Sequence, residues 1–302
     1  MAGQHYQIVG LGEILWDMLP NGKQLGGAPA NFAYISTLLG NDGIVASRIG
    51  SDSLGGEAVQ QLAALGVTTE FVQSDTTHPT GTVRVEVDHA GQPKFEIAEG
   101  VAWDFLEWTS DWHKLATQVD AICFGSLAQR AATSRATIRQ FLGAARKEAV
   151  RVFDVNLRQA FFSSEVLAGS MKVADIVKLN HEELPKIMEL FGLEHRDEIA
   201  SADSLMELHP LKLVCVTRGC RGSLLISQQG LNEHPGYRIQ VADAIGAGDA
   251  FTAGLVHEYL RGSPLPEMNE TANRVGAWVA SQVGAMPSPG KGGIRDETAR
   301  IS

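Results

Sequence analysis

Six short runs of apolar residues recur along the chain, and most of them end in Gly, Asn or Ser. Runs of this length without a polar face are typical of strands buried inside a parallel sheet. The predicted strands cover residues 6–12, 43–50, 119–126, 150–156, 174–180 and 211–219. Stretches with helical spacing fall between them, at residues 29–40, 53–66, 134–149 and 181–192. This alternation predicts a three-layer α/β fold, with helices on both faces of a mostly parallel sheet.

Two further segments have one apolar and one polar face. Residues 82–88 alternate strictly between the two classes, and a polar turn leads on to residues 93–100. Residues 13–27 form a second predicted hairpin, with Asn21-Gly22 as its tight turn. Strands of this kind do not suit the centre of the sheet. We predict that insertions at about 13–27 and 80–102 form a small β-sheet lid on a single domain spanning residues 1–302.

The charge balance narrows the range of partners. The formal net charge is −10, from 25 basic and 35 acidic residues, so we expect no nucleic-acid or membrane partner. The first 15 residues lack the pattern of a secretory signal, and no apolar segment is long enough to span a bilayer. The 3 cysteines form no CxxC pair and indicate free thiols in a reducing compartment. We therefore expect a cytoplasmic protein.

The segment 241–251, VADAIGAGDAF, places three small residues before a carboxylate and an apolar helix. Small residues let the backbone approach a ligand closely, and a helix start offers unpaired N–H groups. The amides of Ala247, Gly248 and Asp249 would thus hold a phosphoryl group, while Asp249 accepts a proton from an attacking hydroxyl. A tight turn at Gly246 with Asp249 as a helix cap explains the segment equally well.

Two other segments carry candidate substrate contacts. In QLGGAPAN, residues 24–31, the glycines permit close backbone approach and Asn31 can bond sugar hydroxyls in both directions. A plain loop before a helix with an early proline is the alternative. In FDVNLR, Asp154, Asn156 and Arg158 alternate at the end of a predicted strand and point to one side. Arg158 could neutralise substrate or phosphate charge, or Asp154 could be its structural partner.

Two strand ends carry candidate nucleotide contacts. In KLNHEEL, Asn180 and Glu183 either cap a helix or organise hydrated Mg²⁺ beside phosphates. In VTRGCRGS, Thr217, Gly219 and Gly222 either form a β-turn or lie along phosphate oxygens.

Several known motifs are missing from the sequence. There is no GxxxxGK[ST], HExxH or GxSxG, which disfavours P-loop enzymes, zinc proteases and serine hydrolases. Gly10 and Gly12 lack the third glycine of GxGxxG, so a Rossmann oxidoreductase is only weakly supported.

The order of these motifs resembles the ribokinase-like (PfkB) family of sugar kinases over essentially the whole chain. GEILWDMLP, LGGAPANFA and DAIGAGDAF look most like the fructokinase branch. The resemblance implies a ribokinase-like fold, ATP as phosphoryl donor with Mg²⁺, and a sugar hydroxyl as acceptor. It implies Asp249 as the base, with Gly246, Ala247 and Gly248 completing the anion hole.

The resemblance also assigns the remaining candidates. Sugar contacts would be Asp17, Gly27 and Asn31, with Arg158 at substrate or phosphate. Asn180 and Glu183 would support Mg²⁺ through water. ATP would lie along Thr217, Gly219 and Gly222, with Asn273 near the adenine. A potassium-type ion would be held mainly by backbone carbonyls at Asp243, Ile245, Gly284 and Ser288.

This chain departs from the family pattern at two places. Ala244 replaces the usual Thr after the first Asp of the C-terminal motif, and Pro29 and Ala30 stand where ribokinases carry a lysine. The second departure favours a ketohexose, and D-fructose yielding fructose 6-phosphate is the leading prediction. The alternatives are a 2-keto-3-deoxygluconate or tagatose-type kinase, less so a nucleoside kinase, or a nucleotide- or sugar-binding protein without catalysis. The apolar side of residues 82–88 further predicts a homodimer joined through the lids.

Overall fold

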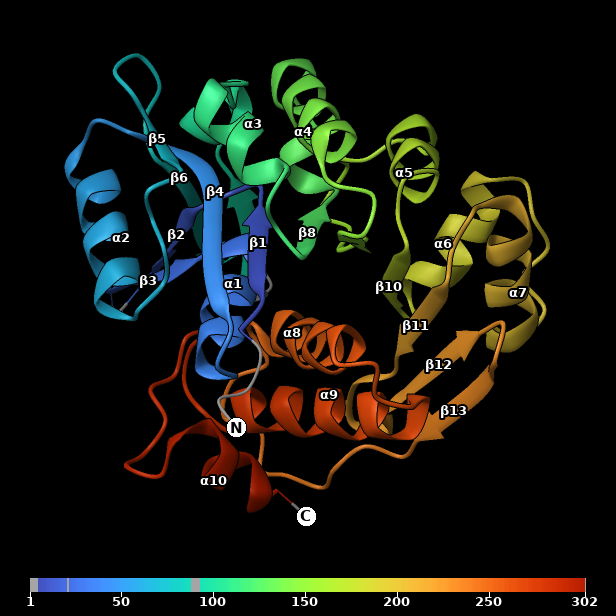
Figure 1. Ribbon diagram of the computed structural model, residues 1–302. Coiled ribbons are helices and arrows are strands. Elements are labelled where there is room, and N and C mark those ends of the chain that lie inside the picture. Colours follow the sequence, from blue (N-terminus) through green and yellow to red (C-terminus); the bar gives the residue numbers. More distant parts are fainter. Residues whose placement is uncertain (1–4, 21, 88–92, 302) are drawn as a thin grey trace.

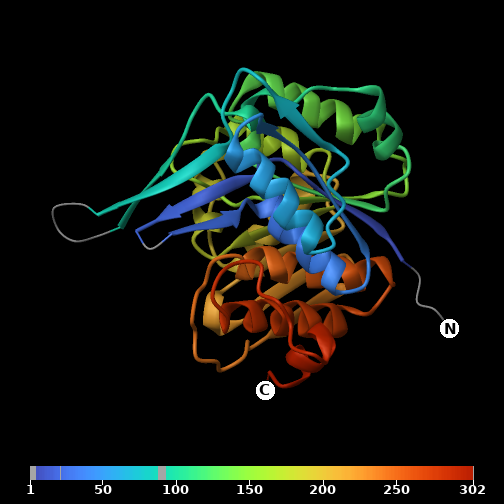
Figure 2. The same cartoon turned by 90° about the vertical axis from the view of Figure 1, so that its left-hand side faces the viewer.

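Helices cover both faces of a large twisted sheet, and a small second sheet projects from one side of the molecule (Figures 1 and 2). The computed structural model describes residues 5–20, 22–87 and 93–301. In the order of the large sheet, its strands are β13 (Gly230–His234), β12 (Ser223–Ser227), β11 (Leu213–Thr217), β10 (Ile176–Asn180), β9 (Val150–Asp154), β8 (Ala121–Gly125), β1 (Gln7–Leu11), β4 (Asp42–Gly50) and β5 (Val72–Asp75).

The seven strands from β11 to β5 are parallel, whereas β12 and β13 are antiparallel at one edge. Residues 6–12, 43–50, 119–126, 150–156, 174–180 and 211–219 do contain strands, so the predicted α/β fold with a mostly parallel sheet is confirmed. Because the strands are parallel, their carboxyl ends lie together on the same side of the sheet. Asn180 on β10 lies beside Thr217 on β11, and Gly125 on β8 lies beside Asp154 on β9.

The helices divide between the two faces. One apolar core joins the sheet to the first group of helices through buried residues such as Trp112, Phe141 and Leu205. This group is α3 (Ser110–Ala116), α4 (Ala132–Ala144), α5 (Ser164–Met171), α6 (Glu183–Leu190) and α7 (Glu198–Leu208). The other core includes Phe32 and Trp278. It joins the sheet to α1 (Ala28–Leu38), α2 (Ser53–Ala64), α8 (Ala247–Leu260), α9 (Leu265–Ala280) and α10 (Gly293–Ala299).

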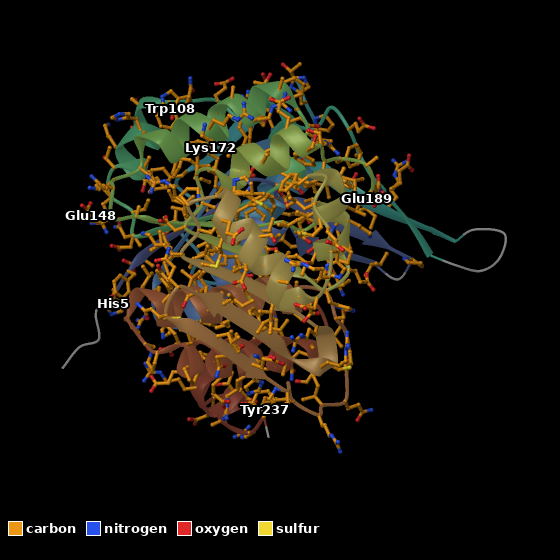
Figure 3. All side chains as sticks on the ribbon, turned by 90° about the vertical axis from the view of Figure 1, so that its right-hand side faces the viewer. His5, Trp108, Glu148, Lys172, Glu189 and Tyr237 are labelled. Carbon is orange, nitrogen blue, oxygen red and sulfur yellow. The ribbon has the colours of Figure 1, made fainter. Side chains whose placement is uncertain are left out.

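Short 3-10 helices complete the chain at η1 (Ala102–Phe105), η2 (Leu127–Gln129) and η3 (Gly219–Arg221). Charged side chains such as Glu148, Lys172 and Glu189 lie on the outer surface (Figure 3). Among the helices that the structure describes, none combines the length and the apolar composition needed to cross a membrane.

The second sheet, which we call the lid, has the strand order β3-β2-β6-β7. Its strands are β2 (Leu15–Leu19), β3 (Gly22–Gly26), β6 (Gly81–Val87) and β7 (Pro93–Ile97). Each predicted hairpin forms as an antiparallel pair, and β2 joins β6 in parallel. The predicted turn residue Asn21 and the turn at 89–92 lie outside the described residues. The chain thus carries the small β-sheet that the sequence predicted beside the main fold.

The lid strand β6 does not expose all of the apolar side chains that its sequence predicts. Val83 was expected on an exposed apolar face, but it is only 6% exposed. Val83 and Ile97 belong to the core beneath the lid, because β6 and β7 turn these side chains inward. The side chains of Val85 and Val87 lie outside the described part. The unpaired edges of β3 and β7 are the lid features left to support a dimer.

Candidate active site

A cavity of about 590 Å³ lies between the lid and the carboxyl ends of the central strands. Its walls come from β2, β6 and β7 of the lid, the start of α1, the loop after β9 and the start of α8. The predicted residues that line it are Asp17, Gly27, Asn31, Arg158, Ile245, Gly246, Gly248 and Asp249. The structure therefore brings the predicted catalytic and sugar-binding residues to one place.

The turn at Gly246 and the first turn of α8 have the geometry of an anion-binding site, which we call the anion seat. Gly246 adopts φ 77°, and a Cβ at this position would lie 2.5 Å from the Cβ of Ala285, so only glycine fits the turn. The N–H of Ala247 donates to the carbonyl of Ala244 at 3.3 Å and closes the turn. The next two N–H groups, of Gly248 and Asp249, enter the first helical turn and point toward its amino end, as an anion site requires.

Asp249 is partly buried in this first turn. The Nδ2 of Asn31 donates to its Oδ2 at 2.7 Å. Burial and then the negative charge of Asp154 raise the pKa of Asp249 to about 6, against the lowering effects of the Asn31 hydrogen bond, Lys178 and Arg158. A carboxylate with this pKa is mostly ionised at neutral pH and can still accept a proton efficiently. The environment therefore suits a general base, beyond a helix cap.

The loop that contains Gly26 and Gly27, which we call the GG loop, places Asn31 against Asp249. Gly27 has φ 107°, and a Cβ there would lie 2.5 Å from the carbonyl oxygen of Glu13. The loop leads directly into α1, with Pro29 near its start and the N–H of Asn31 bonded to the carbonyl of Gly27. The close packing of Gly27 on the segment before the lid fixes the first turn of α1, and with it the Asn31 amide.

The lid contributes Asp17, which lies on β2 between Gln24 of β3 and Val83 of β6. Burial raises the pKa of Asp17 to about 6, while the positive charge of Arg158 opposes the rise. An acceptor on the lid that lines the cavity is placed to bind hydroxyl groups of a substrate.

The loop after β9 differs from its prediction. The strand ends at Asp154, so the expected alternation does not continue, and Asn156 adopts φ 41°. Gln159 is also in the left-handed region, with φ 50°. Strained backbone of this kind concentrates at functional sites. The loop still delivers Asn156 and Arg158 to the cavity, whereas Asp154 pairs with Lys178 rather than with Arg158.

Glu13 lines the cavity and was missed by the sequence interpretation. It lies between β1 and β2, is 4% exposed, and its Oε2 has no partner among the described residues. Burial raises the pKa of Glu13 to about 7, with a further contribution from Asp249, although Arg158 and backbone N–H groups lower it. A carboxyl group that directly follows an apolar strand, in GLGEIL, was the available signal.

Lys178 was the second omission. It occupies the middle of β10, and its Nζ lies 3.1 Å from both carboxylate oxygens of Asp154. Burial lowers the pKa of Lys178, but the carboxylates of Asp154, Glu183 and Asp249 outweigh burial and hold the pKa above its usual range. The signal in the sequence was a lone charge inside an apolar strand.

The predicted nucleotide residues lie along neighbouring strand ends. Asn180 and Thr217 are paired in register, and Gly219 follows with open space where a Cβ would stand. A Cβ on Gly222 would lie 1.9 Å from the carbonyl oxygen of His234, so Gly222 serves the packing of the adjoining strands. Asn273 is 8% exposed, and its Nδ2 lies 2.7 Å from both Ser223 Oγ and the carbonyl oxygen of Asn269.

Comparison with known proteins decides the family. Residues 21–291 match the model of the pfkB family carbohydrate kinases. This chain belongs to that family. It is 30% identical over 297 residues to the fructokinase of Salmonella typhimurium, covering 94% of each chain.

Solved structures agree with this family. A sugar kinase from Pyrococcus horikoshii superposes with a TM-score of 0.83 at 28% identity, covering 98% of this chain and 99% of that one. The same kinase has been solved in complex with ATP. Fructokinase from Vibrio cholerae, a double mutant bound to fructose, ADP and a potassium ion, gives 0.79 at 25% identity over 95% and 96% of the chains. The protein is an ATP-dependent carbohydrate kinase with a ribokinase-like fold.

In this kinase, the donor set around Asn180 fits Mg²⁺ only as a hydrated ion. Both oxygens of Glu183 accept backbone hydrogen bonds, from Leu157 and Asn180 at 2.8 Å each. The Oδ1 of Asn180 in turn accepts from the N–H groups of Glu182 and Glu183. The described residues hold no group of three or more His, Cys, Asp or Glu side chains that could bind a metal directly. Mg²⁺ that arrives with ATP and keeps its waters is compatible with this site.

Hydrogen bonds connect three of the four residues predicted for a monovalent ion. The Oδ1 of Asp243 accepts from the N–H of Ile245 at 3.0 Å, and its Oδ2 accepts from Gly284 at 3.2 Å. Next to Ser288, the carbonyl oxygen of Pro287 accepts from the hydroxyl of Tyr34 at 2.7 Å. The carboxylate of Asp243 thus connects Ile245, just before α8, to Gly284.

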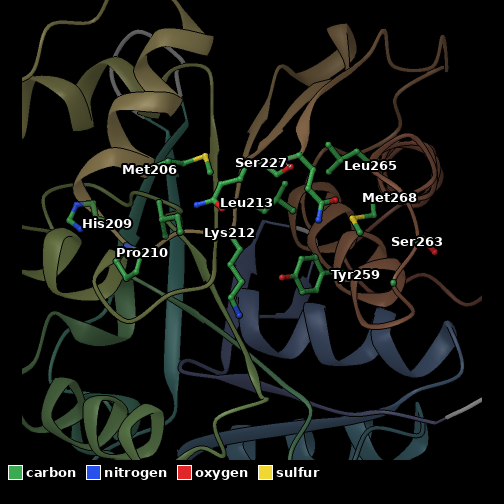
Figure 4. A pocket seen from close by; sticks show the side chains of 14 residues that line it. Met206, His209, Pro210, Lys212, Leu213, Ser227, Tyr259, Ser263, Leu265 and Met268 are labelled. Carbon is green, nitrogen blue, oxygen red and sulfur yellow. Dashed lines mark hydrogen bonds between the residues drawn. The ribbon is translucent and has the colours of Figure 1, made fainter.

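A second cavity, of about 690 Å³, lies on the side of the sheet where the parallel strand β11 begins (Figure 4). Leu213 at the start of β11 and Ser227 at the end of β12 line it, together with the loop between α8 and α9. Its lysine, Lys212, is paired with Asp175 at 2.8 Å. None of the predicted site residues lines this cavity. The cavity beneath the lid is therefore the candidate active site.

Proposed function

We propose that this kinase transfers the γ-phosphoryl group of Mg-ATP to a primary hydroxyl of a ketohexose, with D-fructose as substrate and fructose 6-phosphate as product. The observation that carries the proposal is the Asn31–Asp249 hydrogen bond beside the turn at Gly246, inside a cavity lined in part by the lid. Relatives named fructokinase at 30% identity and a fructose-bound solved relative support the choice of sugar.

The chemistry follows from the position of Asp249. The sugar hydroxyl lies between Asp249 and the amino end of α8, so its proton passes to the carboxylate as its oxygen attacks phosphorus. The N–H groups of Gly248 and Asp249, with the turn at Gly246 and Ala247, hold the phosphoryl oxygens as charge spreads over them. Arg158, on the exposed loop after β9, neutralises part of that charge.

The sugar is bound between the lid and the GG loop. Asp17 accepts hydrogen bonds from sugar hydroxyls on the lid side of the cavity. Asn31 and the backbone at Gly27 contact the sugar from the opposite side. Pro29 and Ala30, both buried, leave no cation on this loop, which favours a neutral ketose. The nucleotide lies along Asn180, Thr217 and Gly219. This placement is supported by their position at the carboxyl ends of the neighbouring strands β10 and β11.

The remaining proposals concern the wider setting. Asn273 and Gly222 are placed near the adenine side, and Asn180 with Glu183 near the waters of Mg²⁺. Asp243, Ile245, Gly284 and Ser288 are proposed to surround a potassium ion. Use of ATP together with three free cysteines favours the cytoplasm. The open edges of β3 and β7 favour a homodimer joined through the lids, which sedimentation at micromolar concentration tests.

The test is ADP release from Mg-ATP with fructose, tagatose, ribose, glucose, adenosine or 2-keto-3-deoxygluconate, each with and without K⁺. The proposal requires fructose to give the highest kcat/KM. Preference for the keto acid would retain the mechanism and assign Arg158 to a carboxylate. No turnover on any sugar, with ATP still bound, would favour a binding protein and direct attention to Ala244.

A further inference from the structure

A lysine stands in the middle of the buried sheet. Lys178 lies on β10 between Asp154 of β9 and Cys215 of β11, and only 6% of it is exposed. A charge in such a strand lowers stability unless it is paired, and a pair of apolar residues would serve the core at least as well. The position of Lys178 therefore needs an explanation other than core packing.

The Lys178 ammonium is held in one place. Both oxygens of Asp154 lie 3.1 Å from Nζ, and the side chains of the pair are 8% and 5% exposed. The Oγ1 of Thr252 on α8 lies 3.0 Å from Asp154 Oδ2 and 2.9 Å from the carbonyl oxygen of Gly248. Thr252 thus fastens the ion pair to the first turn of α8.

This fixed cation faces the anion seat. A Cβ built on Gly248 would lie 3.0 Å from Lys178 Nζ, and Lys178 lines the same cavity as Gly246 and Asp249. The amino end of a helix carries partial positive charge and repels a cation. Lys178 and α8 therefore act unfavourably on each other, but both attract an anion bound between them. An arrangement that becomes favourable when an anion binds points to a ligand.

We propose that Lys178 is a catalytic residue that contacts the γ-phosphoryl group during its transfer, an inference that rests on the proposed function. A bond forms between the sugar oxygen and γ-phosphorus while the bond from phosphorus to the β,γ-bridging oxygen breaks. The electron pair of the broken bond leaves with ADP, and the hydroxyl proton passes to Asp249. Lys178 keeps its proton throughout and neutralises charge on the phosphoryl oxygens.

Lys178 suits this task better than Arg158. Arg158 lies on an exposed loop, and its guanidinium donates to the neighbouring carbonyl oxygen of Leu157 at 3.3 Å. Lys178 is already oriented by Asp154 and needs no rearrangement in the reaction. Fixed charges of this kind stabilise a transition state more effectively than mobile ones. Arg158 then serves mainly to bind substrate and Lys178 to accelerate transfer.

The test compares the single variant Asp154→Asn with the double variant Lys178→Met/Asp154→Asn. The single variant keeps the cation, and the double variant removes both charges without leaving one unpaired. We expect the double variant to fold and to lose about 100-fold in kcat, with KM for the sugar nearly unchanged. The single variant should retain more activity than the double variant.

A merely structural ion pair predicts the opposite order. The double variant would then be near wild type, and Asp154→Asn, with its unpaired buried lysine, would be the worse of the two. That order would overturn the proposal. Thermal unfolding checks both proteins, and Lys178→Gln/Asp154→Asn, which keeps a hydrogen bond across the pair, replaces the double variant should it not fold.

A second readout separates this proposal from the proposed function. Without any sugar, the double variant should bind ADP like the wild type but bind a non-hydrolysable ATP analogue about 10-fold more weakly than the wild type does. Equal losses for both nucleotides, or no loss for either, would refute a contact with the γ-phosphoryl group. A wild type that turns over none of the sugars would refute the proposed function and leave this nucleotide comparison decisive for Lys178.

Discussion

The Nδ2 of Asn31 on α1 donates to Oδ2 of Asp249 on α8 at 2.7 Å, although 218 positions separate the two residues. The bond joins the GG loop at one end of the chain to the anion seat at the other. It engages Oδ2 of Asp249 and so fixes the orientation of the carboxylate. Both motifs therefore work as one unit.

Replacement of Asp249 by Asn removes the base and preserves the shape of the site. We expect kcat to fall about 1000-fold or more, because general-base catalysis typically contributes factors of 100 to 10,000. ATP affinity, measured by calorimetry, should stay within a few-fold of the wild type. Asp203→Asn, on the exposed surface of α7, is the control and should change neither value. Parallel loss of ATP binding and stability would instead mark Asp249 as a structural cap.

Replacement of Asn31 by Ala should shift the pH dependence of the reaction. The pKa of Asp249 is raised to about 6, and the hydrogen bond from Asn31 lowers it. The base must be ionised, so kcat/KM of the wild type should fall as pH drops below about 6. Without Asn31 the pKa rises further, and the acid limb of the profile should move to higher pH.

The control for Asn31→Ala is Thr37→Ala, on the same helix but bonded only within it. Its acid limb should match that of the wild type. An acid limb that stays in place in Asn31→Ala would show that Asp249 does not set the profile.

Replacement of Glu13 by Gln should stabilise the folded protein at neutral and alkaline pH. Burial raises the pKa of Glu13 from 4.5 to about 7, so the folded state binds the proton more tightly than the unfolded state does. The ionised group therefore lowers stability progressively as pH rises from about 4.5 to 7. The variant should gain about 1–3 kcal/mol at pH 8 and much less at pH 5.

Chemical denaturation at the two pH values measures this difference, with the exposed Glu148→Gln as the control. Sugar affinity should fall at the same time, because Glu13 lines the cavity and its Oε2 has no partner in the described part of the protein. Equal effects at pH 5 and pH 8 would refute a raised pKa at Glu13.

Replacement of Gly246 by Ala should damage both fold and activity. A side chain at φ 77° is strained, and its Cβ would meet Ala285 at 2.5 Å. We expect a loss of about 1–3 kcal/mol in stability, together with displacement of the first turn of α8. Gly143→Ala, near the end of α4 with open space around it, should be neutral or stabilising. Unchanged kcat in Gly246→Ala would contradict the anion seat.

The sequence pattern predicted those parts of the molecule that local chemistry determines. Continuous apolar runs predict the parallel strands, and strict alternation predicts the hairpins of the lid. Glycines before Asp249 predict a tight turn at a helix start, and Gly246 occupies that turn.

The pattern failed where distant segments decide the environment of a residue. Lys178 and Glu13 are charged residues that become buried only when α8, β9 and the lid pack around them. The partner of Asp154 could not be read from FDVNLR, because β10 supplies it from a separate segment. Likewise, the burial of Val83 depends on the core beneath the lid, which no single hairpin reveals.

The product formed from fructose and Mg-ATP shows whether the phosphoryl group is transferred to the hydroxyl that we place between Asp249 and the start of α8. Phosphorus NMR of the reaction mixture identifies the hydroxyl that receives the phosphoryl group. We expect fructose 6-phosphate and ADP in equal amounts, formed by the wild type and absent with Asp249→Asn. Phosphate on another position of the sugar, or inorganic phosphate as the main product, would contradict the proposed placement of the hydroxyl between Asp249 and the start of α8.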